Sequence, residues 1–127
     1  MLLSGLFVEY LQGKGRGVFT NVPIGAGEII EVSPVIVMSA REWEALDTTA
    51  LHDYIFVWGE EQNQCCMALG YIPLYNHSYA SNCEYFMDFD KNTMMIKTVR
   101  NIVAGEELTI NYNGDWNNEK PVWFDVQ

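Results

Sequence analysis

Short apolar runs separated by turn residues make up most of the chain. Apart from Glu9, residues 6–11, 54–58 and 65–69 are apolar or aromatic, and each run is followed by glycine or polar residues. Runs of this length between turn signals are typical of β-strands. The same pattern predicts further strands over residues 18–22, 28–32, 35–38, 83–89, 93–99 and 108–112.

Two short segments depart from this strand pattern. Ser39 and Glu42 have the spacing of a capping box, which predicts a helix from about residue 40 to residue 46, and a second helical turn is expected over residues 49–52. The Ser33-Pro34 pair separates two apolar runs, and because proline has no backbone N–H we expect a bend or a sheet edge there. Many short strands with one or two short helices predict a mostly β domain.

Length and charge limit the classes of function. A chain of 127 residues builds one hydrophobic core, so we expect a single domain over residues 1–127. Seven Lys and Arg stand against seventeen Asp and Glu, which gives a formal net charge of -10. Such a charge repels the nucleic-acid backbone and favours a basic partner, although acidity for solubility alone would give the same composition.

Cysteine and histidine usage indicates a reducing compartment and no zinc site. Cys65, Cys66 and Cys83 are odd in number, and a disulfide between the adjacent pair would be strained. No two cysteines have C-x2-C spacing, and His52 and His77 lack metal-type spacing. The apolar N-terminal run lacks a cationic flank, and no run reaches the roughly eighteen apolar residues of a membrane span. We therefore expect an intracellular, cytoplasmic protein with no membrane partner, with a nucleus or a host cell as open alternatives.

The triplet Asn76-His77-Ser78 is the first candidate for chemistry. It lies between Tyr75 and Tyr79, shortly after the apolar run at 65–69. An amide, an imidazole and a hydroxyl at such a place usually serve a ligand or each other. The triplet also reads as a glycosylation sequon, or as an ordinary turn with side chains bonded to nearby backbone. Its own chemistry leaves these interpretations open.

Two further stretches give the triplet a context. Residues 104–112 read as a turn followed by a strand that carries Tyr112 to its far end, and Gly15-Arg16-Gly17 precedes the strand at 18–22. Glycine there lets backbone approach a ligand, although a lone Gly-x-Gly is most often a turn and this one is no Rossmann fingerprint. In order and spacing, residues 15–19, 76–78 and 105–112 resemble the three signatures of the SET domain. That family consists of protein-lysine methyltransferases that use S-adenosylmethionine.

The resemblance covers about residues 5–116 and implies both a fold and a cofactor site. SET domains are β-clip folds of several small sheets, with the C-terminal stretch threaded through a loop in a knot-like substructure beside Asn76-His77. By the same resemblance, backbone around Gly15, Arg16 and Gly17 and the groups of Asn76 and His77 would hold S-adenosylmethionine. His77 is also open to reading as a core histidine whose backbone alone matters.

Aromatic residues carry the remaining implied roles. Tyr112 matches the active-site tyrosine of the family, also placed beside the cofactor, and Tyr85 and Tyr54 are candidates for the lysine channel. Trp116 is a candidate to stack on the adenine. A phenol offers oxygen to a polarised methyl group without adding a full charge, although an ordinary pKa near 10 makes it a poor base. Tyr85 and Tyr54 fit equally well as core tyrosines.

The chain departs from larger SET proteins where those proteins bind zinc. Tyr79 stands where the family often has cysteine, and Ser81-Asn82 replaces a Pro-Asn pair. We expect no metal and no zinc-bound lid. Instead, the C-terminal tail of residues 114–127 carries Trp116, Trp123 and Phe124, which we expect to fold over the site. Minimal relatives can dimerise to complete a substrate groove, so a homodimer is open here.

The number of methyl groups added would depend on the channel. Ile110 stands where relatives carry the Phe or Tyr that sets this number, and isoleucine donates no hydrogen bond. The control then falls to Tyr85, which predicts mainly mono- and dimethyllysine.

Three classes of function remain at this point. The first is methyl transfer from S-adenosylmethionine to lysine in a basic, histone-like protein. The second is a catalytically inactive SET-like module that binds a peptide or cofactor as an interaction domain. The third is a small β-rich interaction domain without a ligand. Because Tyr112, Asn76 and His77 are all present, the sequence favours the enzyme.

Overall fold

The computed structural model describes residues 1–13 and 15–113, and strands dominate this part of the chain. The strands are β1 (Leu6–Leu11), β2 (Gly15–Thr20), β3 (Ile29–Met38), β4 (Ile55–Trp58), β5 (Gln64–Ala68), β6 (Asn76–His77), β7 (Cys83–Asp88), β8 (Thr93–Thr98) and β9 (Glu107–Ile110). The helical segments are α1 (Ala40–Leu46) and the 3-10 helices η1 (Ala50–Tyr54) and η2 (Ile72–Leu74). The mostly β fold expected from the sequence is confirmed.

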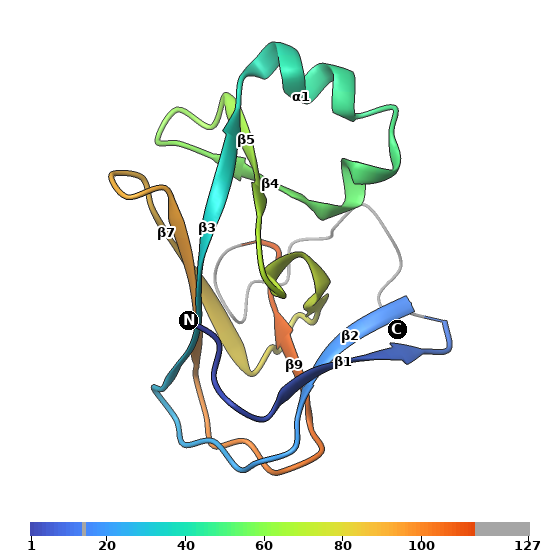
Figure 1. Cartoon of the computed structure of the whole chain (residues 1–127), viewed down its shortest axis with the longest axis vertical. Helices are drawn as coiled ribbons and strands as arrows, with labels where there is room; N and C mark the ends of the chain where they lie inside the picture. The colour runs from blue at the N-terminus through green and yellow to red at the C-terminus, as the bar shows by residue number, and fades with distance from the viewer. Residues whose placement is uncertain (14, 114–127) are drawn as a thin grey trace.

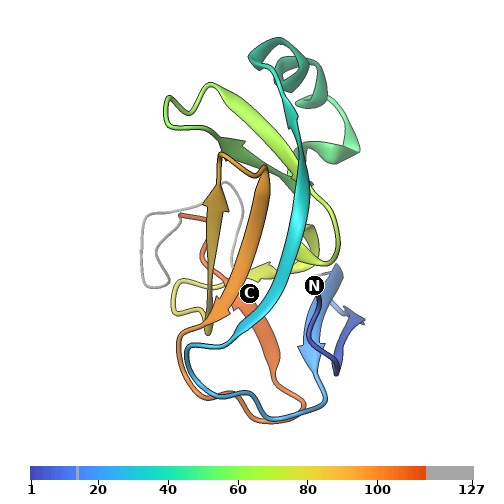
Figure 2. The same cartoon turned by 60° about the vertical axis from the view of Figure 1, so that its left-hand side comes forward.

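The strands form two sheets. One has five strands in the order β4-β5-β3-β8-β7, and the other has four in the order β1-β2-β9-β6. Strand β3 runs along the long axis of the molecule, with α1 at one end of that axis (Figure 1). The loops before β3 and before β9 meet at the opposite end (Figure 2), where Ile24 and Ile102 form an antiparallel bridge. This bridge ties the two sheets together away from α1.

The predicted break at Ser33-Pro34 is wrong, because β3 continues through it. What changes at Pro34 is the neighbouring strand: Pro34 lies opposite Thr93 of β8, whereas Val35 lies opposite Ala68 of β5. Pro34 therefore lies at the point where β3 changes its partner strand, so the missing N–H of proline does not interrupt either ladder. The carbonyl of Pro34 accepts a 3.0 Å hydrogen bond from the N–H of Leu69. One long strand thus belongs to both halves of the five-stranded sheet.

Two strand boundaries also differ from the prediction. Strand β2 begins at Gly15, so Arg16 and Gly17 lie within the strand, opposite Tyr10 and Glu9 of β1. Strand β9 ends at Ile110 and not at Tyr112. Its ladder stops there because the backbone N–H of Tyr112 turns to a side chain, as described below.

The predicted helix over residues 40–46 is confirmed together with its cap. The Ser39 hydroxyl accepts a 3.2 Å hydrogen bond from the N–H of Glu42, and the Glu42 carboxylate accepts one of 3.0 Å from the N–H of Ser39. The second helical turn is the 3-10 helix η1. It begins after Thr49, whose hydroxyl accepts a hydrogen bond from the N–H of Leu51 at 3.2 Å.

A single hydrophobic cluster joins the two sheets. Its fully buried members include Val18 of β2, Ile96 of β8 and Leu108 of β9, each of them 0% exposed. Burying one such side chain contributes about 1.5–3 kcal/mol to stability. Because β2 and β9 belong to one sheet and β8 to the other, this burial fixes the position of one sheet against the other. Among the residues that the structure describes, none of the helices is long and apolar enough to span a membrane.

Candidate active site

Strand β9 brings together three segments that are far apart in the sequence. It pairs with β2 in the antiparallel sense, with Val18 opposite Leu108, and with β6 in the parallel sense, with His77 opposite Ile110. Figure 1 shows β9 in the middle of the molecule, with the β1–β2 hairpin to one side of it. The glycine-containing strand, the Asn-His pair and the segment leading to Tyr112 therefore meet, as the resemblance implied. Threading of the chain through a loop stays a prediction.

A compact polar cradle forms between β2, β6 and β9. The Asn76 amide Nδ2 donates hydrogen bonds to the Glu107 carboxylate at 2.7 Å and to the backbone carbonyl of Arg16 at 3.2 Å. Gly17 has no room for a side chain, since a Cβ there would lie 2.7 Å from Glu107 Oε2 and 2.9 Å from Asn76 Nδ2. The glycine is therefore required by the close approach of an amide and a carboxylate to the β2 backbone.

The edge of this cradle presents a free cation. The side chain of Arg16 is exposed, and it makes no ion pair or hydrogen bond with any residue in the described part of the chain. The backbone of Gly15, just before it, has a φ of 79°, which side-chain-bearing residues rarely adopt. Successive side chains of a strand point to opposite faces, so Arg16 projects away from the face on which Glu107 and Asn76 approach Gly17. The carboxylate of Glu107 is the charged group on the cradle face of this part of the chain.

Tyr112 is held by both its backbone and its hydroxyl. Its backbone N–H donates to Nδ1 of His77 at 3.0 Å, and its hydroxyl donates to the backbone carbonyl of Tyr75 at 2.8 Å. Burial raises the pKa of Tyr112 to about 12, and the charges of Asp53 and Glu107 act in the same direction. Tyr112 is therefore a neutral phenol at physiological pH.

The imidazole of His77 is fixed by this contact. The ring is 4% exposed and lies edge-on to Tyr79, with 4.5 Å between ring centroids. Since Nδ1 accepts the hydrogen bond from Tyr112, that nitrogen carries no proton. Burial also lowers the pKa of His77, which favours the same neutral form. His77 thus uses its ring, and not only its backbone, to place Tyr112.

A buried carboxylate holds Tyr75, the residue whose carbonyl receives the Tyr112 hydroxyl. Glu31 is 0% exposed and accepts hydrogen bonds from the Tyr75 hydroxyl at 3.0 Å, the Ser33 hydroxyl at 2.7 Å and the N–H of Tyr71 at 2.8 Å. Three donors compensate the cost of burying this charged group. The position of the Tyr75 backbone is therefore set from the core and not by solvent.

A cavity of about 130 Å³ opens beside Tyr112. Its volume is below the roughly 300–1,000 Å³ of pockets that take whole small molecules, so it suits a single side chain. The Tyr85 hydroxyl donates to the backbone carbonyl of Tyr112 at 3.3 Å, and the Phe56 ring lies 5.4 Å from that of Tyr85 and 6.3 Å from that of Tyr112. The lining consists of Asp53, Ile55, Phe56, Val57, Pro73, Tyr85 and Tyr112. Most of this wall is apolar or aromatic.

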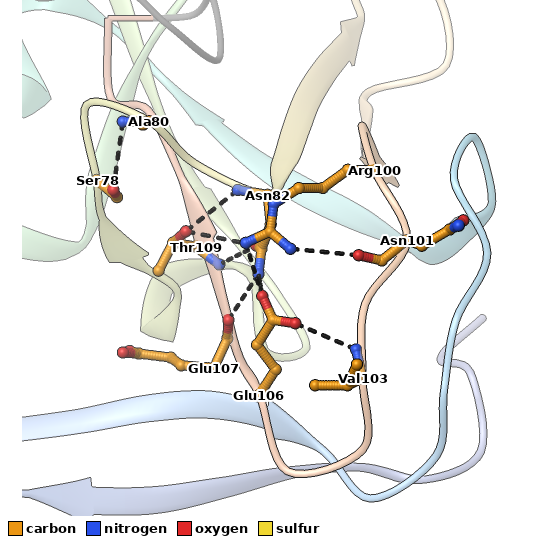
Figure 3. A network of polar contacts seen from close by, with 9 residues as sticks. All are labelled: Ser78, Ala80, Asn82, Arg100, Asn101, Val103, Glu106, Glu107 and Thr109. Atoms are coloured by element: carbon orange, nitrogen blue, oxygen red, sulfur yellow. Dashed lines mark hydrogen bonds and ion pairs between the residues drawn. The ribbon is translucent and has the colours of Figure 1, made fainter.

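A second polar network holds the loop after β6 against β9 (Figure 3). The Asn82 amide donates to the Glu106 carboxylate at 3.0 Å and to the carbonyl of Glu107 at 2.8 Å, and its oxygen accepts from the N–H of Thr109 at 2.8 Å. Arg100 closes the network through a 2.7 Å ion pair with Glu106. Asn82 is 2% exposed, so its own hydrogen bonds are shielded from water. The network fixes β9, and with it the direction in which the chain leaves toward Tyr112.

The predicted site residues divide into three groups. The structure gathers Gly15, Arg16, Gly17 and Asn76 in the cradle and places His77, Tyr85 and Tyr112 around the cavity end of β9. Tyr54 is half-buried at the end of η1 and contributes to the raised pKa of Tyr112, but it does not line the cavity. Trp116, Trp123 and Phe124 lie outside the described residues, so the tail over the site stays a prediction.

Some residues of the site could not be singled out from the sequence. Phe56 and Asp53 line the cavity, Glu107 completes the cradle, and the carbonyl of Tyr75 receives the Tyr112 hydroxyl. The alternation of side chains along a strand predicts which face Phe56 occupies, but it does not predict that Phe56 contacts Tyr85 and Tyr112. The sequence also carries no signal that identifies the backbone carbonyl of Tyr75 as part of the site. Ile110 is buried in the core and does not line the cavity. The described residues contain no group of His, Cys, Asp or Glu placed to hold a metal ion.

Comparison with known proteins identifies this constellation. A family model described as the SET domain matches residues 15–113. The chain belongs to the SET-domain family. A histone-lysine N-methyltransferase of Schizosaccharomyces pombe, H3 lysine-37 specific, is 35% identical over 126 residues, which cover 98% of this chain and 80% of that protein. This SET domain is therefore a protein-lysine methyltransferase.

Solved structures agree with this assignment. The crystal structure of a Plasmodium falciparum protein assigned as a histone methyltransferase is 28% identical, with a TM-score of 0.68 over 91% of this chain and 98% of that one. The ctPRC2 complex in an autoinhibited conformation bound to S-adenosylmethionine gives a TM-score of 0.73 at 19% identity, over 91% of this chain and 16% of that chain. The second likeness supports the SET fold alone.

Proposed function

We propose that this SET domain transfers a methyl group from S-adenosylmethionine to the ε-amine of a lysine in a basic, histone-like protein. The observation that carries the proposal is the position of Tyr112, a neutral phenol held at its hydroxyl and its backbone N–H beside a cavity sized for one side chain. When bound, the cofactor would supply an electrophilic methyl group on a sulfonium centre. The other requirements fall on the residues of this chain.

The cradle fits the amino-acid end of such a cofactor. Asn76 and the backbone of Arg16 are already in hydrogen-bonding contact, and Gly17 leaves the approach to them clear of any Cβ. Glu107 offers a carboxylate, which complements an ammonium group. The cradle therefore suits the ammonium end of such a ligand better than a phosphate, which Glu107 would repel.

The cavity fits the aliphatic part of a lysine. Phe56, Ile55 and Pro73 supply apolar wall for the methylene chain. A lysine of ordinary pKa near 10.4 must lose a proton before it can act as a nucleophile, which costs about 4–5 kcal/mol at neutral pH. An apolar wall lowers this cost because it disfavours the charged ammonium form.

Tyr112 positions the reacting groups and is not the base. With a pKa of about 12 it does not give up its own proton near neutral pH. Because that proton is donated to the carbonyl of Tyr75, the hydroxyl oxygen would meet the methyl group and the amine as an acceptor and not as a donor. Proton loss from the lysine is then left to desolvation in the cavity and to solvent.

The charge of the chain supports a basic substrate. A formal net charge of -10 attracts lysine-rich and arginine-rich segments and repels nucleic acid. The Schizosaccharomyces pombe relative is named for a lysine of histone H3, so histone H3 is the first substrate to test. A non-catalytic module would bind such a protein without modifying it.

The decisive experiment is mass spectrometry of histone H3 and other basic proteins after incubation with the protein and S-adenosylmethionine. We expect mass increases that correspond to added methyl groups, confined to lysine in the fragment spectra. Tight peptide and cofactor binding without any methylated product would instead identify an inactive SET-like module. Calorimetry with S-adenosylmethionine would separate both from a domain without a ligand.

A further inference from the structure

Among the residues that the structure describes, Asp53 is the one charged residue in the wall of the cavity. The other six lining residues are aliphatic, aromatic or phenolic. Asp53 is exposed, whereas Ile55, Phe56, Tyr85 and Tyr112 are partly buried. The carboxylate therefore marks the rim, where the cavity meets solvent, and the neutral phenol of Tyr112 lies further in.

The carboxylate of Asp53 is available for an external partner. It makes no hydrogen bond or ion pair with any residue in the described part of the chain. The neighbouring imidazole of His52 already has a partner, because its Nδ1 lies 3.0 Å from Oδ1 of Asp47. Asp53 is held by η1, which is anchored by the Thr49 cap. Within residues 1–13 and 15–113, a negative charge without a charged or hydrogen-bonding partner thus stands at the entrance to a cavity whose other lining residues are neutral.

The charge of Asp53 is felt inside the cavity. After burial, Asp53 is the largest cause of the raised pKa of Tyr112, ahead of Glu107. A field that disfavours a phenolate at Tyr112 favours a cation in the same space. The raised pKa of Tyr112 and the position of Asp53 on the rim therefore both indicate that a cation is favoured at this end of the cavity.

We infer that Asp53 is a specificity-determining residue that binds the ammonium group of the target lysine at the mouth of the cavity. The inference rests on the proposed lysine methyl transfer. A lysine reaches the protein as a cation, and apolar walls alone would reject it. A carboxylate at the rim offsets the free-energy cost of moving the charged ammonium group out of water. The amine then loses its proton deeper in the cavity, beside Tyr112.

This role has a kinetic signature that distinguishes it from a structural one. Asp53 would strengthen binding of the ground-state ammonium form without contributing to the transfer step. Its loss should raise the KM for substrate without lowering kcat. The effect should shrink as salt is added, because the carboxylate is exposed and its charge is screened.

The test compares two peptides and three variants. The peptides are a histone H3 segment centred on lysine 37 and the same segment with norleucine at that position, which keeps the aliphatic chain and removes the ammonium group. The variants are Asp53→Asn, Asp53→Glu and, as a matched control, Asp90→Asn. Asp90 is exposed in the turn after β7 and does not line the cavity. Affinities come from fluorescence anisotropy at low and high salt, and rates from mass spectrometry.

We expect Asp53→Asn to weaken binding of the lysine peptide by about two- to fivefold at low salt, as for an exposed ion pair. Binding of the norleucine peptide should stay unchanged, Asp53→Glu should restore most of the loss, and Asp90→Asn should match the unmodified protein. Equal weakening of both peptides would overturn the inference, because Asp53 would then bind another group of the substrate. So would an unchanged affinity for the lysine peptide. Absence of transfer by the unmodified protein on every basic substrate would instead refute the proposed function itself, and this inference with it.

Discussion

The hydroxyl of Tyr112 donates its only proton to the backbone carbonyl of Tyr75, across 2.8 Å. The two residues are 37 positions apart in the chain, and Tyr75 is in turn held from the core by Glu31. The proton of this hydroxyl is therefore bound to the protein itself, and Tyr112 lines the cavity. Its orientation is set before any ligand binds.

Replacing Tyr112 by phenylalanine should remove this hydroxyl and leave the carbonyl of Tyr75 without its partner. Loss of such a buried hydrogen bond costs about 1–3 kcal/mol, so we expect kcat to fall about ten- to a hundredfold. Cofactor affinity should change much less. Single-turnover assays and calorimetry on the same preparation measure the two effects separately. Tyr10→Phe is the matched control, since Tyr10 is 75% exposed on β1. Full turnover in Tyr112→Phe would show that another group fills the role.

The substitution Asn76→Ala should weaken S-adenosylmethionine binding. It removes the amide that joins Glu107 to the β2 backbone and leaves the Glu107 carboxylate without this donor. We expect a loss of about 1–3 kcal/mol in binding free energy. Calorimetry measures it, with circular dichroism as the check on folding. Asn63→Ala, in the exposed turn after β4, should bind like the unmodified protein. An Asn76→Ala protein with unchanged affinity would place the cofactor elsewhere.

Gly17→Ala tests the cradle by adding an atom and not by removing one. The new Cβ would lie 2.7 Å from Glu107 Oε2 and 2.9 Å from Asn76 Nδ2, so the amide and the carboxylate must move apart. Cofactor affinity should fall by about five- to 150-fold, since overpacking of this kind costs about 1–3 kcal/mol. Gly25→Ala is the matched control, because its Cβ would meet nothing nearer than 3.7 Å. Equal affinities of the two variants would mean that the cradle does not touch the cofactor.

The protein should lose stability on acidification through His77. The folded-state pKa of this histidine is lowered from its ordinary value of 6.5 by burial, so the folded state favours the neutral ring. The corresponding stability is complete above the unfolded pKa and is lost as the pH falls through the folded one. Protonation of Nδ1 would also break its hydrogen bond with Tyr112.

Urea unfolding between about pH 8 and about pH 5 measures this dependence. The free energy of unfolding should fall below about pH 6.5 in the unmodified protein, and the decrease should be smaller in His77→Asn, whose amide oxygen can still accept a hydrogen bond. Identical pH dependence in the two proteins would assign the loss of stability to other groups.

Tyr85→Phe should raise the number of methyl groups added to one lysine. Tyr85 lines the cavity and its hydroxyl donates to the carbonyl of Tyr112, so its oxygen would lie near an amine bound in the cavity. The unmodified protein should yield mainly mono- and dimethyllysine. The variant should shift the distribution upward, because a hydrogen bond of about 1 kcal/mol no longer restrains the methylated amine. Mass spectrometry at limiting enzyme gives the distribution. Predominant trimethyllysine from the unmodified protein would rule out this role of Tyr85.

Features encoded by neighbouring residues could be predicted from the sequence. The capping box of Ser39 and Glu42 spans one helical turn, and the apolar runs of β1 and β8 alternate with clear turn signals. The site signatures at residues 15–17, 76–77 and 112 were found through resemblance, and the structure brings them to the two sides of β9. These predictions depend on local chemistry or on family spacing, and both can be read from one chain.

The remaining features depend on which segments meet across long distances in the chain. Pro34 was expected to end a strand because a proline cannot donate a hydrogen bond to a neighbouring strand. In the structure, β3 pairs with β8 up to Pro34 and with β5 from Val35, and this change of partner depends on the arrangement of the whole sheet. The contact of Phe56 with Tyr85 and the salt-bridged network of Asn82 with Glu106 likewise need three-dimensional register. A single sequence carries no signal for such pairings.

The central position of β9 has a consequence for how the domain folds. Strands β2, β6 and β9 are separated by long stretches of chain, so closing them into one sheet requires the loss of much loop entropy before the contacts form. The cradle and the Tyr112 contacts can then exist only in molecules that are folded almost throughout. A ligand of this site would act as a pharmacological chaperone, shifting even destabilised variants toward the native state in proportion to its concentration.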